Sequence, residues 1–305
     1  MPCFHPLQLI IYEDILDREG KPLRKVFPSN PPIKNSKYPV IRIPCGQCIG
    51  CRLDRSKDWA ARCVLEASSH DNNCFITLTF NDYFLPADNS IHKRDIQLFM
   101  KRLRKKFGAG IRFFACGEYG ELLERPHYHA ILFGFDFPDK VPFSVRDGNT
   151  YYISETLMKL WPYGFSTIGQ VTFESCAYVA RYVCKKITGD KAAEHYKGRE
   201  PEFLLMSRKP GIAKQWFDEF QRDVYPNDFV VVRDGIKQKP PRYFDKLYDV
   251  INPDDMARIK EDRIAGAIAN YDDNTPARLE VKEELQLLKA KKLIRGYEKG
   301  DNING

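Results

Sequence analysis

The sequence predicts a protein of the α+β class, in which helices cover one antiparallel sheet. Three observations indicate this class: short β-branched and aromatic runs, amphipathic helical stretches between them, and two neighbouring strand-like runs joined by a loop that contains Gly and Pro. With 43% hydrophobic and 13% aromatic residues, the 305-residue chain has enough apolar side chains for a substantial core. We therefore expect a globular fold that is built around a sheet.

The central region begins with a helix, a strand and a second helix. Residues 53–69 are mostly good helix formers, and Trp59, Cys63 and Ala67 recur one turn apart. The run CFITLTF at 74–80 has the composition of a buried strand and is bounded by polar residues. An amphipathic helix that ends at Gly108 follows, with the basic run KRLRKK on its exposed side. The apolar positions of this helix are Ile96, Phe99, Met100, Leu103 and Phe107.

A β-hairpin and a strand between two helices complete the central pattern. IRFFACGE (111–118) and HYHAILFGF (127–135) form the predicted hairpin. SETLMKLW is helical, FSTIGQVTF is a fourth strand, and SCAYVARYVCKKITG is a helix that begins near Glu174 and closes at Gly189. The order β-α-β-β-α-β-α is typical of a ferredoxin-like α+β arrangement, with helices mainly on one face of the sheet.

The two flanks have weaker patterns. Residues 1–44 are rich in Pro and charge, so we expect an irregular arm with one hairpin at most. After residue 190 we predict a helix in SRKPGIAKQWFDEF, a clamp or linker in KQKPPRYFDKLY, and a charge-dense helical segment at 253–298 that breaks near Asn274-Thr275-Pro276. The predicted parts are an N-terminal arm (1–52), a catalytic domain (53–235), and a charged linker with a helical C-terminal extension (236–305).

Charge and hydropathy limit the functional classes. The net charge of +7 and pI near 8.8 permit a polyanionic partner. No run approaches the roughly 18 apolar residues of a membrane span, and the start MPCFHPLQLI lacks the features of a signal peptide. We therefore expect a soluble intracellular protein without a membrane partner.

Two histidines and two tyrosines suggest chemistry. In an extended chain His127 and His129 share one face while Tyr128 points to the other. In a helix, Tyr178 and Tyr182 stack on one face. Each pair on its own is also compatible with plain packing, the histidines as strand-end residues and the tyrosines as half-buried ones.

Both pairs are explained together by transesterification of a phosphodiester. A phenol with a pKa of roughly 10 is a poor nucleophile, so it needs a metal to polarise the phosphate and cations nearby. His127 and His129 supply nitrogen ligands, and Glu118 on the neighbouring strand supplies an oxygen. This mixed set suits Mn²⁺ or Mg²⁺. Lys185 and Lys186 would assist as charge partners.

The sequence resembles the HUH endonucleases, and within them the rolling-circle replication initiators of microviruses, gokushoviruses in particular. CFITLTF is similar to the first motif strand, GEYG followed by RPHYH to the second motif, and YVARYVCKK to the third. PCGQCIGCR, SRKPGIA and PPRYFD also look like segments of that phage group, and the resemblance covers most of residues 1–250. It implies an HUH endonuclease fold for residues 53–235.

The resemblance also implies roles for individual residues. His127, His129 and Glu118 match the metal ligands, and Tyr178 and Tyr182 match the nucleophiles. One tyrosine would nick single-stranded DNA at the origin of the phage genome and keep a 5′-phosphotyrosine link, and the second would later rejoin the strand. Which tyrosine acts first stays open, as does a mechanism in which Tyr182 alone acts with Lys185 or Lys186.

The same resemblance implies partners. The sequence contains no G-x-x-x-x-G-K-[ST], and EGKP at 19–22 has Pro where the hydroxyl residue would stand. We therefore expect a host helicase and DNA polymerase as partners, in the cytoplasm of the bacterial host. Two alternatives remain: a transposase or relaxase of the same superfamily, and a non-enzymatic, zinc-nucleated nucleic-acid-binding protein whose histidines and tyrosines only pack.

A cysteine cluster predicts a second metal site. Nine cysteines at uneven spacing indicate metal binding among free thiols more than disulfides, and Cys45, Cys48 and Cys51 follow C-x2-C-x2-C. Structural zinc needs a fourth ligand, for which Cys3 is the best candidate, with His5 behind it. An iron–sulfur cluster of the ferredoxin type would place its fourth cysteine at 55, where the chain has Arg. The other cysteines, Cys63, Cys74, Cys116, Cys176 and Cys184, are expected to be small core residues.

Overall fold

A computed structural model describes residues 3–28, 33, 36–120, 123–146, 148–185 and 191–291, without the side chains of 181–185, 191 and 291. The chain divides into two compact units, each of which is described by itself. One unit combines residues within 1–54 and 264–293, and the other contains residues 55–263.

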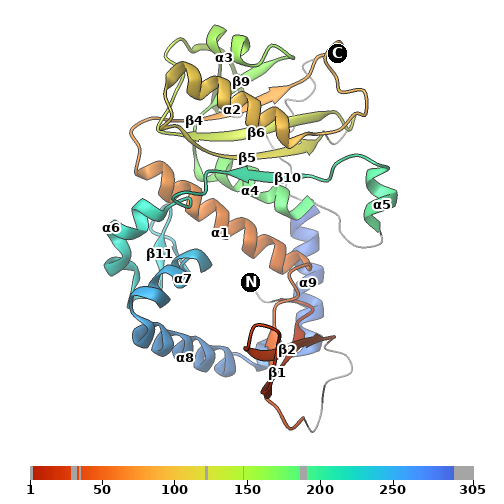
Figure 1. Ribbon diagram of the computed structural model, residues 1–305, viewed down its shortest axis with the longest axis vertical. Coiled ribbons are helices and arrows are strands. Elements are labelled where there is room, and N and C mark those ends of the chain that lie inside the picture. Colours follow the sequence, from red (N-terminus) through yellow and green to blue (C-terminus); the bar gives the residue numbers. More distant parts are fainter. Residues whose placement is uncertain are drawn as a thin grey trace. The chain divides into compact units, whose positions relative to one another are not determined.

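The larger unit is organised around an antiparallel sheet (Figure 1). Its seven strands follow the spatial order β10 (Phe203–Met206), β5 (Arg112–Tyr119), β6 (Pro126–Phe133), β4 (Asn73–Thr79), β9 (Ser166–Gly169), β8 (Asn149–Ile153) and β7 (Val141–Arg146). The predicted α+β class and the order of the central elements are therefore confirmed. Sequence reasoning did not find the β7–β8 hairpin or β10, although the dipeptide Asp147-Gly148 is a strong hairpin signal.

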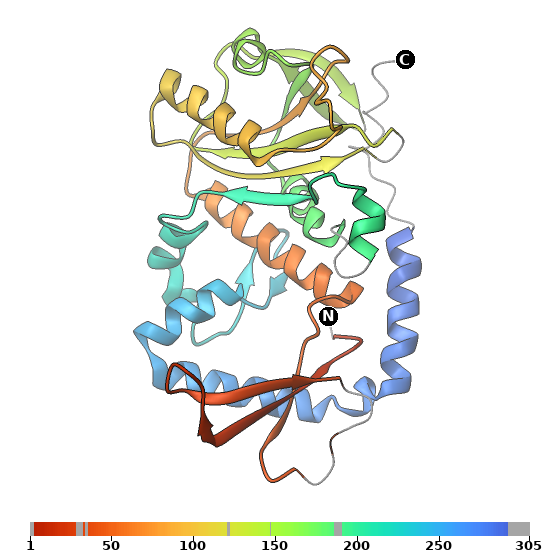
Figure 2. The same cartoon turned by 45° about the vertical axis from the view of Figure 1, so that its right-hand side comes forward.

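Helices cover both faces of this sheet (Figure 2). Helices α2 (Lys93–Phe107) and α3 (Glu155–Leu160) share one core with Ile76 and Leu78 of β4. Helices α1 (Ile49–Ser68) and α4 (Phe173–Lys185) share the other core with Phe75. The prediction of helices mainly on one face is therefore wrong. The reason lies in β6, which is buried along its whole length and must be covered from both sides.

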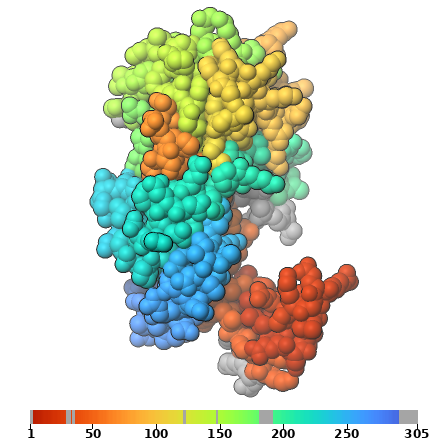
Figure 3. All heavy atoms as spheres, turned by 60° about the vertical axis from the view of Figure 1, so that its left-hand side comes forward, coloured from red at the N-terminus to blue at the C-terminus, as the bar shows by residue number. Residues whose placement is uncertain are grey.

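A third core joins the helices that follow the sheet. Helices α6 (Lys214–Val224), α7 (Arg242–Ile251) and α8 (Pro253–Ala269) contribute Phe217, Phe244 and Met256 to it. In the space-filling view the spheres of these helices, turquoise to blue, merge into one mass (Figure 3). The linker expected in KQKPPRYFDKLY is corrected here, because the residues after Pro241 form α7 and bury Phe244.

The remaining elements of this unit are small. They are α5 (Lys191–Tyr196), β11 (Val230–Val231) and β12 (Lys237–Gln238).

The smaller unit contains a three-stranded antiparallel sheet in the order β2 (Pro22–Phe27), β1 (Leu7–Leu16) and β3 (Val40–Ile43). The prediction of an irregular arm is therefore wrong, because the predicted hairpin, β1–β2, is extended by a third strand, β3. Gln8, which is buried on β1, holds two backbone groups of the segment that follows β2. It donates to the Pro28 carbonyl at 2.6 Å and accepts from the Ile33 N–H at 2.8 Å.

The same unit contains the end of the described chain. The predicted break near Asn274-Thr275-Pro276 is confirmed, because a short helix at Asp272–Asn274 (η1) separates α8 from α9 (Pro276–Lys291). Within the described ranges, no helix is both long and apolar enough to cross a lipid bilayer.

Gly164 provides a test of the packing at the β4–β9 junction. A Cβ at this position would lie 2.6 Å from the Asn81 backbone nitrogen and closer still to the Thr79 carbonyl oxygen. Gly164→Ala should therefore lower the free energy of unfolding by roughly 2–3 kcal/mol, seen as a lower urea midpoint.

The matched control is Gly110→Ala, since a Cβ at Gly110 meets no atom within 4 Å. The control should keep the wild-type midpoint or raise it slightly. Equal midpoints for the two variants would contradict the tight backbone approach.

Candidate metal and nucleophile site

Strand register brings the predicted metal ligands together. In the β5–β6 ladder Glu118 pairs directly with His127, and Cys116 pairs with His129. On the other side of β6, strand β4 places Thr79 opposite His127 and Thr77 opposite His129. Because neighbouring residues on paired strands share a face, the three side chains converge on the face that α4 covers.

The three ligand atoms lie within bonding range of one cation. Glu118 Oε1 is 2.8 Å from His127 Nε2 and 3.0 Å from His129 Nε2. In an octahedral site with bonds of about 2.1 Å, neighbouring ligand atoms are roughly 3.0 Å apart. The observed spacing therefore fits a shared divalent cation. All three residues are buried.

The outer nitrogens of both imidazoles are also held. His127 Nδ1 donates to the Arg125 carbonyl at 3.1 Å, and His129 Nδ1 lies 2.9 Å from Thr77 Oγ1. A proton on Nδ1 leaves the neutral imidazole with a lone pair on Nε2, and that atom faces a carboxylate oxygen. Two electron-rich atoms at this distance require a positive charge between them, which a proton or a metal cation provides.

The charge state of Glu118 suits a metal ligand. Burial raises the pKa of its carboxyl group, but the charges and hydrogen bonds of His127 and His129 outweigh burial and lower that pKa to about 2. The carboxylate is therefore ionised at neutral pH although its side chain is buried.

Tyr178 is the predicted nucleophile that the structure places at this site. Helix α4 directs its hydroxyl to 3.5 Å from Glu118 Oε1 and 3.4 Å from His129 Nε2. The ring is buried and meets the His129 and Phe75 rings edge-on, with centroids 5.0 and 6.3 Å apart. A phenol oxygen thus lies beside two of the three candidate metal ligands.

The other predicted catalytic groups fall outside the described part of the chain. The side chains of Tyr182 and Lys185 are not described, and neither is Lys186. Their roles stay predictions from the sequence.

Sequence reasoning missed the groups that orient the histidines. Thr77 fixes His129 through Nδ1, and the Phe75 ring stacks on the His129 ring with centroids 5.5 Å apart. Both belong to CFITLTF, where alternation places Phe75 and Thr77 on one face. Alternation would have identified that face, but it could not identify the partner strand.

The cysteine cluster lies in the smaller unit. The sulfur atoms of Cys3, Cys45, Cys48 and Cys51 all lie within 4.8 Å of one another, and Cys3 Sγ is 3.9 Å from Cys48 Sγ. A tetrahedral zinc site with Zn–S bonds of about 2.3 Å separates its sulfurs by roughly 3.8 Å. The cysteines that the structure describes form no disulfide. His5 is instead paired with Glu283 at 2.7 Å.

Backbone N–H groups point at these sulfur atoms. Phe4 N–H donates to Cys48 Sγ at 3.4 Å, and Cys48 N–H donates to Cys45 Sγ at 3.3 Å. Burial raises the pKa of the Cys48 thiol, but N–H donors including Phe4 lower that pKa to about 7. At Cys3 and Cys51, by contrast, burial outweighs the donors and raises the pKa of the thiol, so the donors favour the thiolate, the form that binds a metal, at Cys48.

Comparison with known proteins places the chain in a family. Residues 73–187, which include β4 and α4, match the family model described as "Replication-associated protein ORF2/G2P". The chain is similar to "Replication-associated protein ORF2" of Spiroplasma virus 4, at 37% identity over 267 residues, which cover 81% of this chain and 80% of the relative. The chain belongs to the family of phage replication-associated proteins.

Two further family members give the same result. "Replication-associated protein VP4" of Bdellovibrio phage phiMH2K is 33% identical over 220 residues, which cover 69% of each chain. "Replication-associated protein ORF4" of Chlamydia phage 1 is 31% identical over 225 residues, covering 70% of this chain and 55% of the relative. No solved structure matches the chain. The resemblance to microvirus initiators is thereby confirmed at the level of the family.

The Thr77 hydroxyl gives a test of the site geometry. Thr77→Val keeps the shape of the side chain but removes the partner of His129 Nδ1, so the affinity for Mn²⁺ should fall roughly 10- to 100-fold. Isothermal titration calorimetry measures this change.

Thr167→Val is the matched control. Thr167 lies on β9, where it pairs with Thr77, and is thus one strand further from His129. If both variants bound Mn²⁺ as the wild type does, Thr77 would have no part in orienting the ligand.

Proposed function

We propose that the chain initiates rolling-circle replication by nicking single-stranded DNA at the origin of a phage genome and later rejoining the strand. The observation that carries this proposal is the Tyr178 hydroxyl, which lies 3.4 Å from His129 Nε2 and 3.5 Å from Glu118 Oε1. Family membership supports the role in replication. We assign the chemistry to residues 53–235, which include the segment that matches the family model.

The reaction is a transesterification. The oxygen of Tyr178 or Tyr182 attacks the phosphorus atom and forms a new P–O bond, while the bond from phosphorus to the 3′ oxygen breaks. The phenol loses its proton, the 3′ oxygen gains one, and the 5′ phosphate stays on the tyrosine. Attack by a second hydroxyl, that of a 3′ end or of the other tyrosine, reverses or transfers the link. The nick thus stores the energy of the phosphodiester for religation.

The residues that would hold a cation are Glu118, His127 and His129. Mn²⁺ or Mg²⁺ at these ligands would polarise the scissile phosphate and favour the phenolate. The protein itself keeps Glu118 ionised, fixes both imidazoles through Nδ1, and holds the Tyr178 ring in an apolar setting. Lys185 and Lys186 are the proposed charge partners of the developing phenolate.

The proposed partners follow from the reaction. A nicked origin must be unwound and extended, and the sequence lacks the phosphate-binding loop of a helicase. We therefore assign unwinding and synthesis to a host helicase and DNA polymerase, in the cytoplasm of a bacterial host.

We propose a structural zinc ion for the four-cysteine cluster. The four sulfur atoms within 4.8 Å of one another and the N–H donors to sulfur support it. The zinc would attach Cys3, near the N-terminus, to the turn before α1, where the apolar cluster around Phe4 and Leu279 is small.

The decisive measurement for the nickase is adduct formation. Single-stranded fragments that tile the phage genome are labelled, incubated with the protein and Mn²⁺, and separated on a denaturing gel, and any protein–DNA adduct is mapped by peptide analysis. Wild type should form a 5′-phosphotyrosine adduct, and His129→Ala should form none because a cation ligand is lost. Tyr178→Phe and Tyr182→Phe show which phenol leads.

Tyr128→Phe is the control for these tyrosine variants. Its hydroxyl donates to Asp95 at 2.7 Å on the opposite face of β6, so the adduct should persist. If the protein bound DNA tightly but gave no adduct and no cleavage with any divalent metal, the nickase proposal would be wrong, and a nucleic-acid-binding protein would be the better description.

The zinc proposal has a separate test. Mass spectrometry under non-denaturing conditions should find about one zinc ion per chain in the wild type and none in Cys48→Ala. Cys74→Ala, which changes a buried core cysteine outside the cluster, should retain the metal. A metal-free wild type, purified without chelators, would show that the cluster is a group of thiols.

A further inference from the structure

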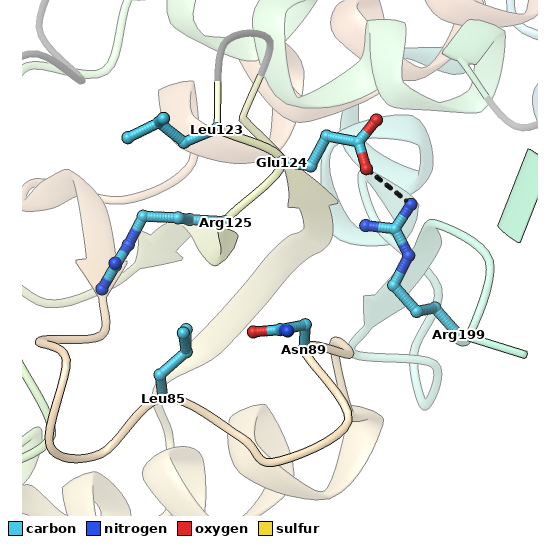
Figure 4. A pocket seen from close by; sticks show the side chains of 6 residues that line it. All are labelled: Leu85, Asn89, Leu123, Glu124, Arg125 and Arg199. Carbon is cyan, nitrogen blue, oxygen red and sulfur yellow. Dashed lines mark ion pairs between the residues drawn. The ribbon is translucent and has the colours of Figure 1, made fainter. Parts of the chain in front are cut away.

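A cavity of about 340 Å³ opens at the end of the sheet where β5 leads into β6. Three loops that are distant in sequence line it, and Figure 4 shows their side chains around one open space, with Arg125 and Arg199 on opposite sides. The lining residues are Leu85, Asn89, Leu123, Glu124, Arg125 and Arg199.

The cavity and the candidate metal site share one backbone segment. The side chain of Arg125 lines the cavity, while its carbonyl oxygen accepts from His127 Nδ1 at 3.1 Å. Arg125 Nη2 also donates to the Phe80 carbonyl at 3.0 Å, next to Thr79, which pairs with His127. The cavity therefore lies at the end of β6 that carries His127.

The cavity is built to attract an anion. Its lining carries two guanidinium groups and one carboxylate. Arg199 is fixed from inside, with its guanidinium 4.5 Å from the centre of the Tyr119 ring and its Nε donating to the Tyr196 carbonyl at 3.3 Å. Its side chain is 16% exposed, whereas that of its partner Glu124 is 62% exposed.

The carboxylates that face the two arginines are replaceable. Arg199 pairs with Glu124 at 2.8 Å, and Arg125 pairs with Asp82 at 2.6 Å. The Asp82 side chain is 92% exposed, and ion pairs with such exposed partners contribute little free energy. A phosphate group can therefore take the place of either carboxylate at low cost.

Exposed aromatic rings stand in the loop that also contributes Leu85 to the cavity. Tyr83 and Phe84 lie between Asp82 and Leu85, and they are 88% and 42% exposed. Their rings meet edge-on with centroids 4.9 Å apart, and Phe84 also contacts Tyr163 at 5.6 Å. An anchored but exposed ring of this kind is the usual platform on which an unpaired base stacks.

We propose that this cavity and Tyr83 form a subsite for one nucleotide of the single-stranded DNA, next to the scissile phosphate. Arg125 and Arg199 hold its phosphate, Tyr83 stacks on a base, and the Asn89 amide contacts a base edge. The volume is near the lower end of small-ligand pockets, roughly 300–1,000 Å³, which suits a single nucleotide. The proposed subsite rests on the proposed nickase function. Its residues position the DNA and take no part in the chemical step.

Binding to a fluorescein-labelled oligonucleotide that contains the mapped nick site tests the subsite. By fluorescence anisotropy, Tyr83→Ala should bind roughly tenfold more weakly than wild type, whereas Tyr83→Phe, which keeps the ring, should bind normally. Because Tyr83 is exposed, the melting temperature should not change. At saturating DNA the rate of adduct formation should stay near wild type, so KM moves and kcat does not.

The charge of the subsite is tested by salt dependence. Arg199→Gln should reduce the slope of log K against log salt by about 0.7, the value for one phosphate contact on a single strand. The matched control is Arg258→Gln, which changes an arginine of α8 that is 61% exposed and also has a carboxylate partner, Asp255. The control should keep the wild-type slope.

A single abasic nucleotide, moved along the same oligonucleotide, locates the stacked base. One position near the nick should weaken wild-type binding and should have no further effect on Tyr83→Ala. The subsite would be overturned, and the nickase would stand, if wild type nicks this DNA while Tyr83→Ala keeps the wild-type affinity and Arg199→Gln keeps the wild-type slope of log K against log salt. If no fragment of the genome yields an adduct, the nickase fails, and the same abasic series on the fragment that wild type binds most tightly still decides whether the cavity binds a nucleotide.

Discussion

The register between β5 and β6 is the constraint on which the rest of the site depends. A slip of one residue would turn Glu118 away from His127 and move both histidines to the opposite face. The fold prevents this slip from the far side of the sheet. Tyr128, between the histidines, buries its ring in the core on that side, against the rings of Phe80 and Trp161 and together with the apolar residues of α2. Helix α2 thus holds in place a constellation that it never touches.

The two-sided cover of β6 also determines the electrostatics of the site. Because α4 closes over the histidines, the carboxylate, the imidazoles and the phenol meet in a setting where water screens them little. Charges in such a setting are costly unless they are paired, so the carboxylate needs a positive charge beside it, which a proton on an imidazole or a bound cation would supply. The exposed loops at the end of the sheet differ from this buried site, because their ion pairs are weak and exchangeable. Such contacts suit a surface that the proposed single-stranded DNA must reach and leave.

Sequence patterns within single strands and helices predicted much of the fold and of the site. Features that depend on the pairing of distant segments could not be predicted in this way. Alternation correctly separated the faces of β6, and helical spacing correctly placed Cys63 in the core under α1. Register across strands is a property of the folded sheet, so Thr77 could not be identified as the partner of His129. The cavity unites loops far apart in sequence and was invisible for the same reason. A short run such as β10 (Phe203–Met206) carries too few residues to show a period.

Arg125 has two ends with different tasks, since its carbonyl oxygen orients a candidate cation ligand and its guanidinium borders the cavity. A ligand that immobilises the guanidinium also immobilises the carbonyl, and so removes part of the entropy that His127 would lose on binding a cation. Nucleic acid and cation would then bind with positive cooperativity. Because linkage is reciprocal, each would raise the affinity for the other by the same factor. A protein with this coupling would bind its cation most tightly when a DNA strand is already bound.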